Sequence, residues 1–264
     1  MAQPVRFALG NLSSVGRVRE RNEDYFGYFE PPESDLPKKG RLFIVADGMG
    51  GETAGDVASR LAVKIVHESY FADVTTDPTQ ALRVSLQAAN RAIYEHAQSQ
   101  PDGVRMGTTC TALVVQDEAA HVAHVGDTRA YLIRGRAMTR LTRDHSLAES
   151  GHANILTRAL GMNPDVDVDV LDRPLPISLE DMFLLCSDGL WGHVEDGELL
   201  RTVLASPDPQ AACRDLVALA NDKGGRDNIT VQLVRIAGAA DGREAATRPR
   251  PGLLAGLRRF LGAA

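Results

Sequence analysis

"VADGMGG", residues Val45–Gly51, closes an apolar run with one acid and a glycine-rich turn. The run before the acid, Leu42–Val45, has the composition of a buried β-strand. A carboxylate at the end of such a strand favours one of two kinds of site. The turn is either a phosphate cradle made of backbone N–H groups or a metal site made of acids.

The residues of this turn do not match those of a phosphate-binding loop. Gly50 and Gly55 have the G-x-x-x-x-G spacing, but Asp56 and Val57 follow where a P-loop needs Lys and Ser/Thr. Without that lysine the turn cannot neutralise nucleotide phosphates, so a P-loop NTPase is rejected. The G-x-S-x-G and H-E-x-x-H motifs are also absent from the sequence.

The pattern of an apolar strand, an aspartate and a tight turn recurs along the chain. A single Asp-Gly pair is most often a turn or a helix cap. Five aspartates at strand ends are harder to explain in that way, because clustered carboxylates repel each other unless cations hold them. Mg²⁺ and Mn²⁺ prefer such oxygen ligands, and a glycine beside the acid lets a backbone carbonyl approach the ion. The five are Asp24, Asp47, Asp127, Asp188 and Asp227.

The order of expected elements favours an α+β fold with largely antiparallel sheet, because strands and helices do not alternate regularly. So many strands need two sheets, and the economical arrangement is a β-sandwich with amphipathic helices outside. The expected strands are 5–11, 24–29, 41–47, 108–116, 119–126, 128–134, 166–172, 181–187 and 228–236. The expected helices are 53–71, 78–98, 196–205 and 209–222.

Composition restricts the class of protein. The 264 residues suit one large domain or two small ones, and a net charge of -6 gives no case for nucleic-acid binding. We find no signal-peptide pattern and no apolar run long enough to span a membrane. Three widely spaced cysteines favour reduced, buried thiols and a cytoplasmic protein, and without a C-x-x-C pair they do not indicate a zinc site.

The last segment, 237–264, is rich in Ala, Gly, Pro and Arg, and we expect it to be a flexible tail behind a domain of residues 1–236. Residues 252–261 place three leucines on one side of a short helical pattern beside two arginines. Two readings stay open: a floppy tail, because isolated short helices are weak, or a contact with a membrane surface or a partner protein.

Eight motifs in order, covering about residues 5–236, resemble the metal-dependent serine/threonine protein phosphatases of the PPM (type 2C) family in its bacterial form. Each motif alone is weak, whereas the ordered set is specific. They are "RERNED" (19–24), "VADGMGG" (45–51), "GTT" (107–109), "VGDTRAYL" (125–132), "LTRDHS" (141–146), "LTRALG" (156–161), "CSDGLW" (186–191) and "GRDNITV" (225–231).

The resemblance implies a four-layer αββα fold, in which a central antiparallel β-sandwich is flanked on both faces by helix pairs. It also implies two Mn²⁺ or Mg²⁺ ions in a cleft at one end, with a weaker third. By position, Asp47 matches the bridging carboxylate and Gly48 the backbone ligand, while Arg19 matches the arginine that grips the substrate phosphate. The other implied metal positions are Asp188 and Asp227 for the first ion, Glu23 and Asp24 for the second, and Asp127 with Asp188 for the third.

The implied reaction is hydrolysis of phosphoserine and phosphothreonine by attack of a metal-bridging water, and it needs no covalent phosphoenzyme. The implied partners are phosphorylated proteins, among them a bacterial Ser/Thr kinase and its substrates. Two alternatives stay open: a non-catalytic phosphatase-like binding or sensor module, and a hydrolase of small phosphate esters.

The sequence departs from the family at several points. Met49 stands where many eukaryotic members have a histidine that is a candidate general acid, so the proton donor is unassigned. His145, in "DHS", is a candidate for it, although a structural turn is the more common use of that motif. Gly192 replaces a further aspartate that some members use at the third metal. The flap expected between "DHS" and "TRALG" is short, about residues 147–156.

Overall fold

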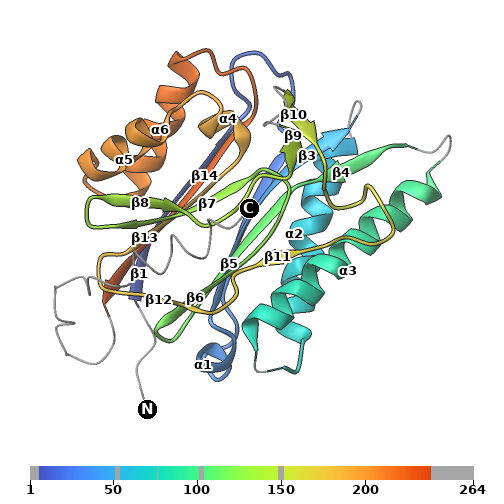
Figure 1. Ribbon diagram of the computed structural model, residues 1–264, viewed down its shortest axis with the longest axis horizontal. Coiled ribbons are helices and arrows are strands. Elements are labelled where there is room, and N and C mark those ends of the chain that lie inside the picture. The colour runs from blue at the N-terminus through green and yellow to red at the C-terminus, as the bar shows by residue number, and fades with distance from the viewer. Residues whose placement is uncertain (1–5, 51–53, 76, 101–103, 148–151, 239–264) are drawn as a thin grey trace.

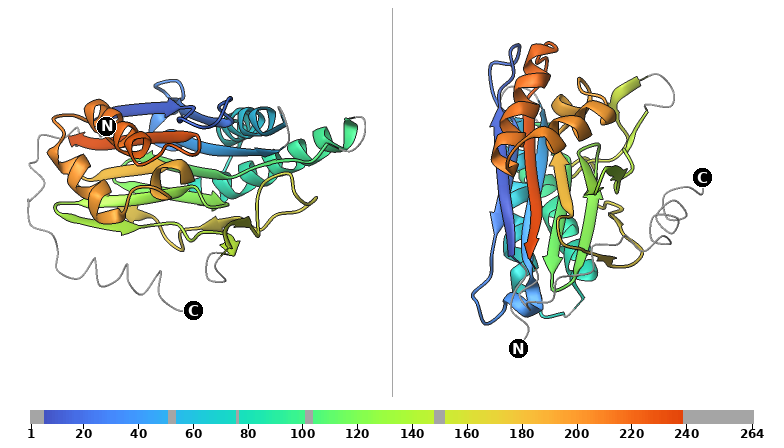
Figure 2. Two further views of the ribbon diagram at one scale, coloured as in Figure 1. Left: turned by 90° about the horizontal axis from the view of Figure 1, so that it is seen from above. Right: turned by 90° about the vertical axis from the view of Figure 1, so that its left-hand side faces the viewer.

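Four layers, helix–sheet–sheet–helix, make up the molecule (Figures 1 and 2). The computed structural model describes residues 6–50, 54–75, 77–100, 104–147 and 152–238. Every strand pair in its sheets is antiparallel, which confirms the predicted α+β sandwich with helices on both outer faces. The expectations for the tail beyond Gly238 and for part of the short flap lie outside the described residues.

One sheet joins the first and last strands of the domain. Its order is β1 (Arg6–Ser14), β14 (Ile229–Gly238), β13 (Met182–Cys186), β7 (Arg129–Arg134) and β8 (Ala137–Arg140). Because β1 pairs with β14 as far as Gly238, the last strand continues two residues past its predicted end.

The second sheet carries the strand of the opening motif. Its main order is β11 (Asp169–Val170), β6 (Ala119–Val125), β5 (Cys110–Gln116), β3 (Arg41–Gly50) and β2 (Asp24–Phe29), with β12 (Leu175–Pro176) on β6 and β4 (Met106–Thr108) on β3. A separate pair is formed by β9 (Ser146–Leu147) and β10 (His152–Leu156). The predicted strand 166–172 was too long: only Asp169 and Val170 of β11 pair with β6, and pairing with β6 resumes at β12.

Each outer layer is a pair of helices. Helices α2 (Ala54–Ala72) and α3 (Pro78–Ser99) cover the second sheet, and α5 (Asp196–Ala205) and α6 (Pro209–Asp222) cover the first (Figure 1). The starts of α3 and α6 follow capping rules, because Asp77 accepts from Thr79 N–H, Asp208 accepts from Ala211 N–H, and a proline opens each helix. Two short helices, α1 (Leu36–Lys39) and α4 (Asp188–Trp191), were not predicted.

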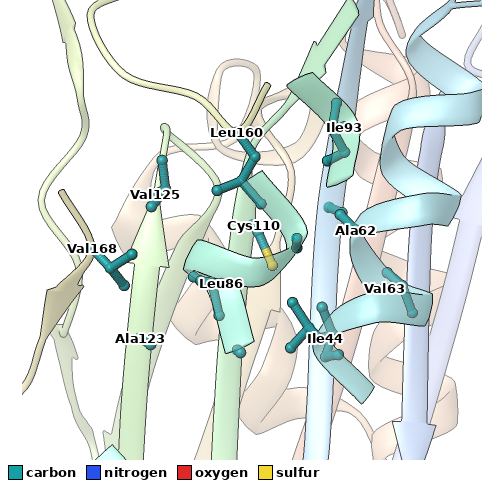
Figure 3. Packing of buried hydrophobic residues seen from close by; sticks show 14 of the residues in the cluster. Ile44, Ala62, Val63, Leu86, Ile93, Cys110, Ala123, Val125, Leu160 and Val168 are labelled. Carbon is teal, nitrogen blue, oxygen red and sulfur yellow. The ribbon is translucent and has the colours of Figure 1, made fainter. Parts of the chain in front are cut away.

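Three clusters of buried apolar residues hold these elements together, one between the two sheets and one under each pair of outer helices. Phe43, Leu132 and Phe183 belong to the core between the two sheets. Ile44, Leu86 and Cys110 belong to the core between the second sheet and its helices, shown in Figure 3. All three cysteines are buried and free, as the sequence suggested. Among the described residues, no helix is long and apolar enough to cross a bilayer.

Candidate active site

Two of the five aspartates face each other across neighbouring strands. Asp24 opens β2, and in the β2–β3 register it stands opposite Asp47. Contrary to expectation, β3 does not end at Asp47. It continues to Gly50 because β4 offers a new partner, with Gly48 opposite Thr108. The aspartate of "VADGMGG" therefore lies inside a strand, where a ladder fixes its backbone.

The "GTT" motif provides that ladder. Thr109 Oγ1 accepts from the Asp47 N–H at 3.0 Å, and the Asp47 carbonyl accepts from Thr109 N at 2.9 Å and from Thr108 Oγ1 at 2.9 Å. Both peptide groups of Asp47 are thus satisfied by two adjacent threonines. The sequence alone does not assign a role to these threonines.

Ser187 connects the second sheet to the first. Its hydroxyl donates to Asp24 Oδ2 at 2.7 Å and accepts from Thr230 N at 2.9 Å. Asp188 follows directly as the first residue of α4, so the carboxylate is presented at the junction of β13 and this short helix. The serine hydroxyl thereby holds the two sheets in register at the end where the acids gather.

Arg19 and Asp227 lie on two loops at the same end. The Arg19 guanidinium donates from Nη2 to Asp227 Oδ2 at 2.7 Å, and the arginine side chain remains 51% exposed. Asn228 fastens the loops: its Oδ1 accepts from Glu23 N at 2.8 Å, and its Nδ2 donates to the Arg21 carbonyl at 2.8 Å. Asn228 was not predicted as a site residue, and its place inside "GRDN" was the available signal.

Gly48 is in close contact with the start of α2. A Cβ at this position would lie 2.1 Å from the Gly55 carbonyl oxygen and 2.6 Å from that of Glu23. A Cβ on Gly55 would in turn lie 2.6 Å from Glu23 Oε1. Packing therefore requires glycine at both positions, a reason independent of the carbonyl access that the sequence suggested for Gly48.

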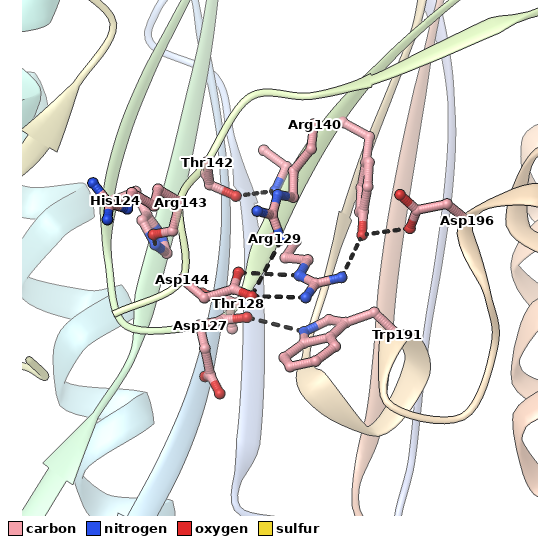
Figure 4. Close-up of polar contacts among 12 residues, drawn as sticks. His124, Asp127, Thr128, Arg129, Arg140, Thr142, Arg143, Asp144, Trp191 and Asp196 are labelled. Atoms are coloured by element: carbon pink, nitrogen blue, oxygen red, sulfur yellow. Dashed lines mark hydrogen bonds and ion pairs between the residues drawn. The ribbon is translucent and has the colours of Figure 1, made fainter. Parts of the chain in front are cut away.

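Asp127 occupies the turn between β6 and β7 and is 4% exposed. The Trp191 indole donates to its carbonyl oxygen at 2.9 Å, while the Asp127 carboxylate points away from the polar network around Arg129 (Figure 4). All seven residues predicted to hold metal thus lie at one end of the sandwich, on β2, β3 and the turns that precede or follow β2, β6, β13 and β14.

The five aspartates influence one another's pKa values. Burial raises the pKa of Asp47 well above its usual value, and repulsion by the other four aspartates adds to the rise. Burial raises the pKa of Asp24 to about 7, and burial with repulsion from Asp188 raises the pKa of Asp127 to about 7. The pKa of Asp188 is raised by burial and by Asp227, against a hydrogen bond with Asp47. Without a cation, the ionised forms of these carboxylates are unfavourable because they are buried and repel each other.

The donor set suits hard divalent cations. Glu23 Oε1, Asp24 Oδ1 and Asp188 Oδ1 are buried, and no hydrogen-bond partner is found for them among the described residues. Buried carboxylate oxygens without donors are costly, and Mg²⁺ or Mn²⁺ would satisfy them. Within the same residues, no three His, Cys, Asp or Glu side chains already have the spacing of a metal cluster. The assignment of divalent cations to this site therefore rests on the oxygen ligands present and on the buried oxygens that have no hydrogen-bond partner.

His145 is not placed for proton transfer. It is 3% exposed, its Nδ1 accepts from Gly126 N at 3.0 Å and its Nε2 contacts Asp169 Oδ2 at 3.1 Å. Both ring nitrogens are therefore committed to structural contacts. The structural reading of "DHS" is the one that the geometry favours.

Comparisons with known proteins agree with this geometry. Residues 16–224 match the family described as protein phosphatase 2C. The serine/threonine phosphatase stp of Listeria monocytogenes is 35% identical over 249 residues, spanning 87% of this chain and 96% of that protein. A solved serine/threonine phosphatase of S. agalactiae superposes with a TM-score of 0.78 at 30% identity, covering 88% of this chain and 100% of the other. The catalytic domain of the phosphatase PstP, solved with two manganese ions, superposes with a TM-score of 0.72 at 30% identity, covering 88% and 100% of the two chains.

Proposed function

This chain belongs to the protein phosphatase 2C family and is a metal-dependent protein-serine/threonine phosphatase, and from that premise we propose how its residues perform the reaction. The observation that carries the proposal is the group of buried, unpartnered carboxylate oxygens on Glu23, Asp24 and Asp188. These atoms stand where the sandwich brings the remaining predicted ligands together.

We assign two divalent cations, Mn²⁺ or Mg²⁺, to this end of the sandwich. The solved PstP domain with two manganese ions supports the number and the metal. Asp47 would contact both ions, with Asp188 and Asp227 on the first, Asp24 and Glu23 on the second, and the Gly48 carbonyl as a backbone ligand. Asp127 and Asp188 would share a third, weaker ion. When bound, the ions supply an activated water and neutralise charge on the phosphoryl group.

The protein's own groups position the phosphoester. Arg19 is exposed and presents a guanidinium fork, which matches two phosphate oxygens. Its contact with Asp227 orients the fork toward the carboxylate cluster. Met49 has no proton to give to the leaving group, and both nitrogens of His145 are engaged, so neither residue is assigned as the general acid.

The proposed substrates are phosphoserine and phosphothreonine in proteins, including a bacterial Ser/Thr kinase and the proteins it phosphorylates. The naming of the Listeria relative as a serine/threonine phosphatase supports this class. We place the reaction in the cytoplasm, which the three free, buried cysteines favour. We propose that the reaction does not need residues 239–264, whose leucines and arginines suit a contact with a membrane surface or a partner protein.

One assay tests the function against its alternatives. We expect the purified protein to dephosphorylate phosphoserine and phosphothreonine peptides in Mn²⁺ or Mg²⁺ and to stop when a chelator is added. Higher kcat/KM for peptides than for small phosphate esters supports a protein phosphatase. The reverse order would indicate a small-ester hydrolase. Metal-independent turnover would overturn the metal assignment, and no turnover in either ion would indicate a binding module.

A further inference from the structure

One hydrogen bond joins two turns that carry site carboxylates. The Trp191 Nε1–H donates to the Asp127 carbonyl oxygen at 2.9 Å. Trp191 is the last residue of α4, the helix that Asp188 begins. The indole therefore ties the β6–β7 turn, which holds Asp127, to the four-residue helix that holds Asp188 (Figure 4).

Arg129 holds the indole in place. Its guanidinium carbon lies 3.6 Å from the centre of the Trp191 ring, a close cation–π stack. The guanidinium is fixed by two hydrogen bonds to Asp144, at 3.0 Å and 2.7 Å, and by one to Tyr131 Oη at 3.1 Å. Arg129 and Asp144 side chains are only 14% and 12% exposed, so solvent screens this arrangement weakly.

The turn is also held from its other side. His145 accepts from Gly126 N at 3.0 Å through Nδ1, and its own N–H donates to the Gly126 carbonyl at 2.7 Å. Gly126 has φ +110°, and a Cβ there would lie 2.5 Å from Thr109. His145 thus holds the backbone of Gly126. The bond from Trp191 then holds the next residue, Asp127, close to α4.

We propose that Trp191 and Arg129 form a clamp of positioning residues that fixes the separation of Asp127 and Asp188, and thereby sets the affinity for the cation these two carboxylates share. Neither clamp residue is assigned as a ligand of the ion or as a contact of the substrate. It acts on the backbone of one ligand and on the helix of the other, as outer groups do at metal sites in general. This inference rests on the proposed function, because it needs the two aspartates to be ligands.

The test is Mn²⁺ binding to Trp191→Phe, measured by titration calorimetry well below the unfolding temperature. The substitution keeps a ring for Arg129 and removes the N–H donor. We expect the weakest Mn²⁺ step to lose about ten-fold or more in affinity, the range found when outer groups of metal sites are removed. The matched control is Tyr70→Phe, which deletes another buried aromatic donor, to the Lys39 carbonyl at 2.7 Å, far from the site. It should leave Mn²⁺ binding unchanged.

A second variant guards against a Trp191→Phe protein that does not fold. Arg129→Lys keeps the indole N–H but loses the fork and the planar stack, and it should weaken the same step several-fold. Folded variants that bind every Mn²⁺ equivalent as tightly as the wild type would overturn the clamp alone. A wild-type protein that binds no Mn²⁺ would overturn the proposed function, and the clamp with it.

Discussion

Asp24 and Asp47 stand directly opposite each other in the β2–β3 pair, so one register position of the sheet carries two carboxylates. Like charges in opposed positions destabilise a sheet, and burial of Asp24 adds to the cost. A fold that keeps this pair gives up stability at the place where the other three aspartates also converge. Stability and activity are therefore expected to make opposite demands at Asp47.

Asp47→Asn is expected to separate stability from activity. In metal-free protein it should raise the free energy of unfolding by about 1 kcal/mol, because burial and the other aspartates disfavour the ionised form of Asp47 and asparagine has no such form. In Mn²⁺ it should lower phosphatase activity more than about 100-fold, because Asp47 is proposed to contact both ions. Denaturant unfolding and a phosphopeptide assay measure the two effects. Asp215→Asn, an exposed change on α6, should alter neither. Full activity in Asp47→Asn would remove this residue from the site.

Gly48→Ala is expected to be destabilising although alanine is small. Its Cβ would lie 2.1 Å from the backbone oxygen of Gly55, so the start of α2 would have to move. We expect a loss of about 1–3 kcal/mol in the free energy of unfolding, the cost of forcing atoms into packed space. Gly197→Ala is the comparison, since its nearest neighbour is the Arg201 Nη1 at 3.5 Å, and it should leave stability unchanged or slightly raised. Equal effects of the two substitutions would contradict the packing argument.

Arg19→Ala is expected to lower kcat/KM for phosphopeptides by about 10²–10³-fold, the range for losing one donor to developing charge. Arg19→Lys should recover part of the loss, because a lysine keeps the charge and loses the fork. Arg17→Ala provides a matched control: this arginine is also exposed and paired with an acid, Asp222, at 3.2 Å. Arg17→Ala with a loss as large as that of Arg19→Ala would mean that general surface charge matters and the fork does not.

Trp191 offers an optical test, because it is the single tryptophan of the chain. Its indole bonds to the Asp127 backbone, and its helix begins at Asp188. Added Mn²⁺ is therefore expected to change its fluorescence, with a midpoint that matches activation of the enzyme. Asp188→Asn should remove the response or shift it to much higher Mn²⁺ concentration. A response that persists unchanged in Asp188→Asn would place the ion elsewhere.

Much of the fold and of the candidate site could be predicted because the decisive patterns are local. The run before Asp47 reads as a buried strand, and the amphipathic periods of α2 and α3 give their ends to within one residue. Aspartates at strand ends predicted a carboxylate cluster, and in the structure the other four lie near enough to Asp47 to raise its pKa. Their roles as metal ligands stay predictions.

Other features depend on partners that are distant in the chain. The continuation of β3 to Gly50 needs β4, some sixty residues later, and Asn228 acts on backbone more than two hundred residues away. The stack of Arg129 on Trp191 joins residues from two different motifs. Nothing in the spacing of a single motif signals such contacts, because side-chain hydrogen bonds and stacking depend on tertiary packing.

His124 should make stability depend on pH. It is 2% exposed, its Nε2–H donates to the Arg143 carbonyl at 3.1 Å, and its Nδ1 bonds to Thr111 Oγ1 at 2.8 Å. Burial lowers the pKa of His124 to about 3, and the neighbouring His145 adds to the shift. Between the ordinary histidine pKa of about 6.5 and that value, the unfolded chain binds a proton that the folded chain refuses. Its stabilising contribution is therefore complete above pH 6.5 and is lost as pH falls.

The expected size follows from about 1.4 kcal/mol per pH unit, so the wild type should lose about 2 kcal/mol relative to His124→Gln between pH 7 and pH 5. The comparison with a variant is needed because the pKa of Asp24 and Asp127 is raised to about 7, and such groups stabilise the fold as pH falls in the same window. Their contribution is common to both proteins and cancels in the difference. Urea unfolding of metal-free protein at pH 7, 6 and 5 measures it. Parallel curves for the two proteins would show that His124 accepts a proton in the folded state.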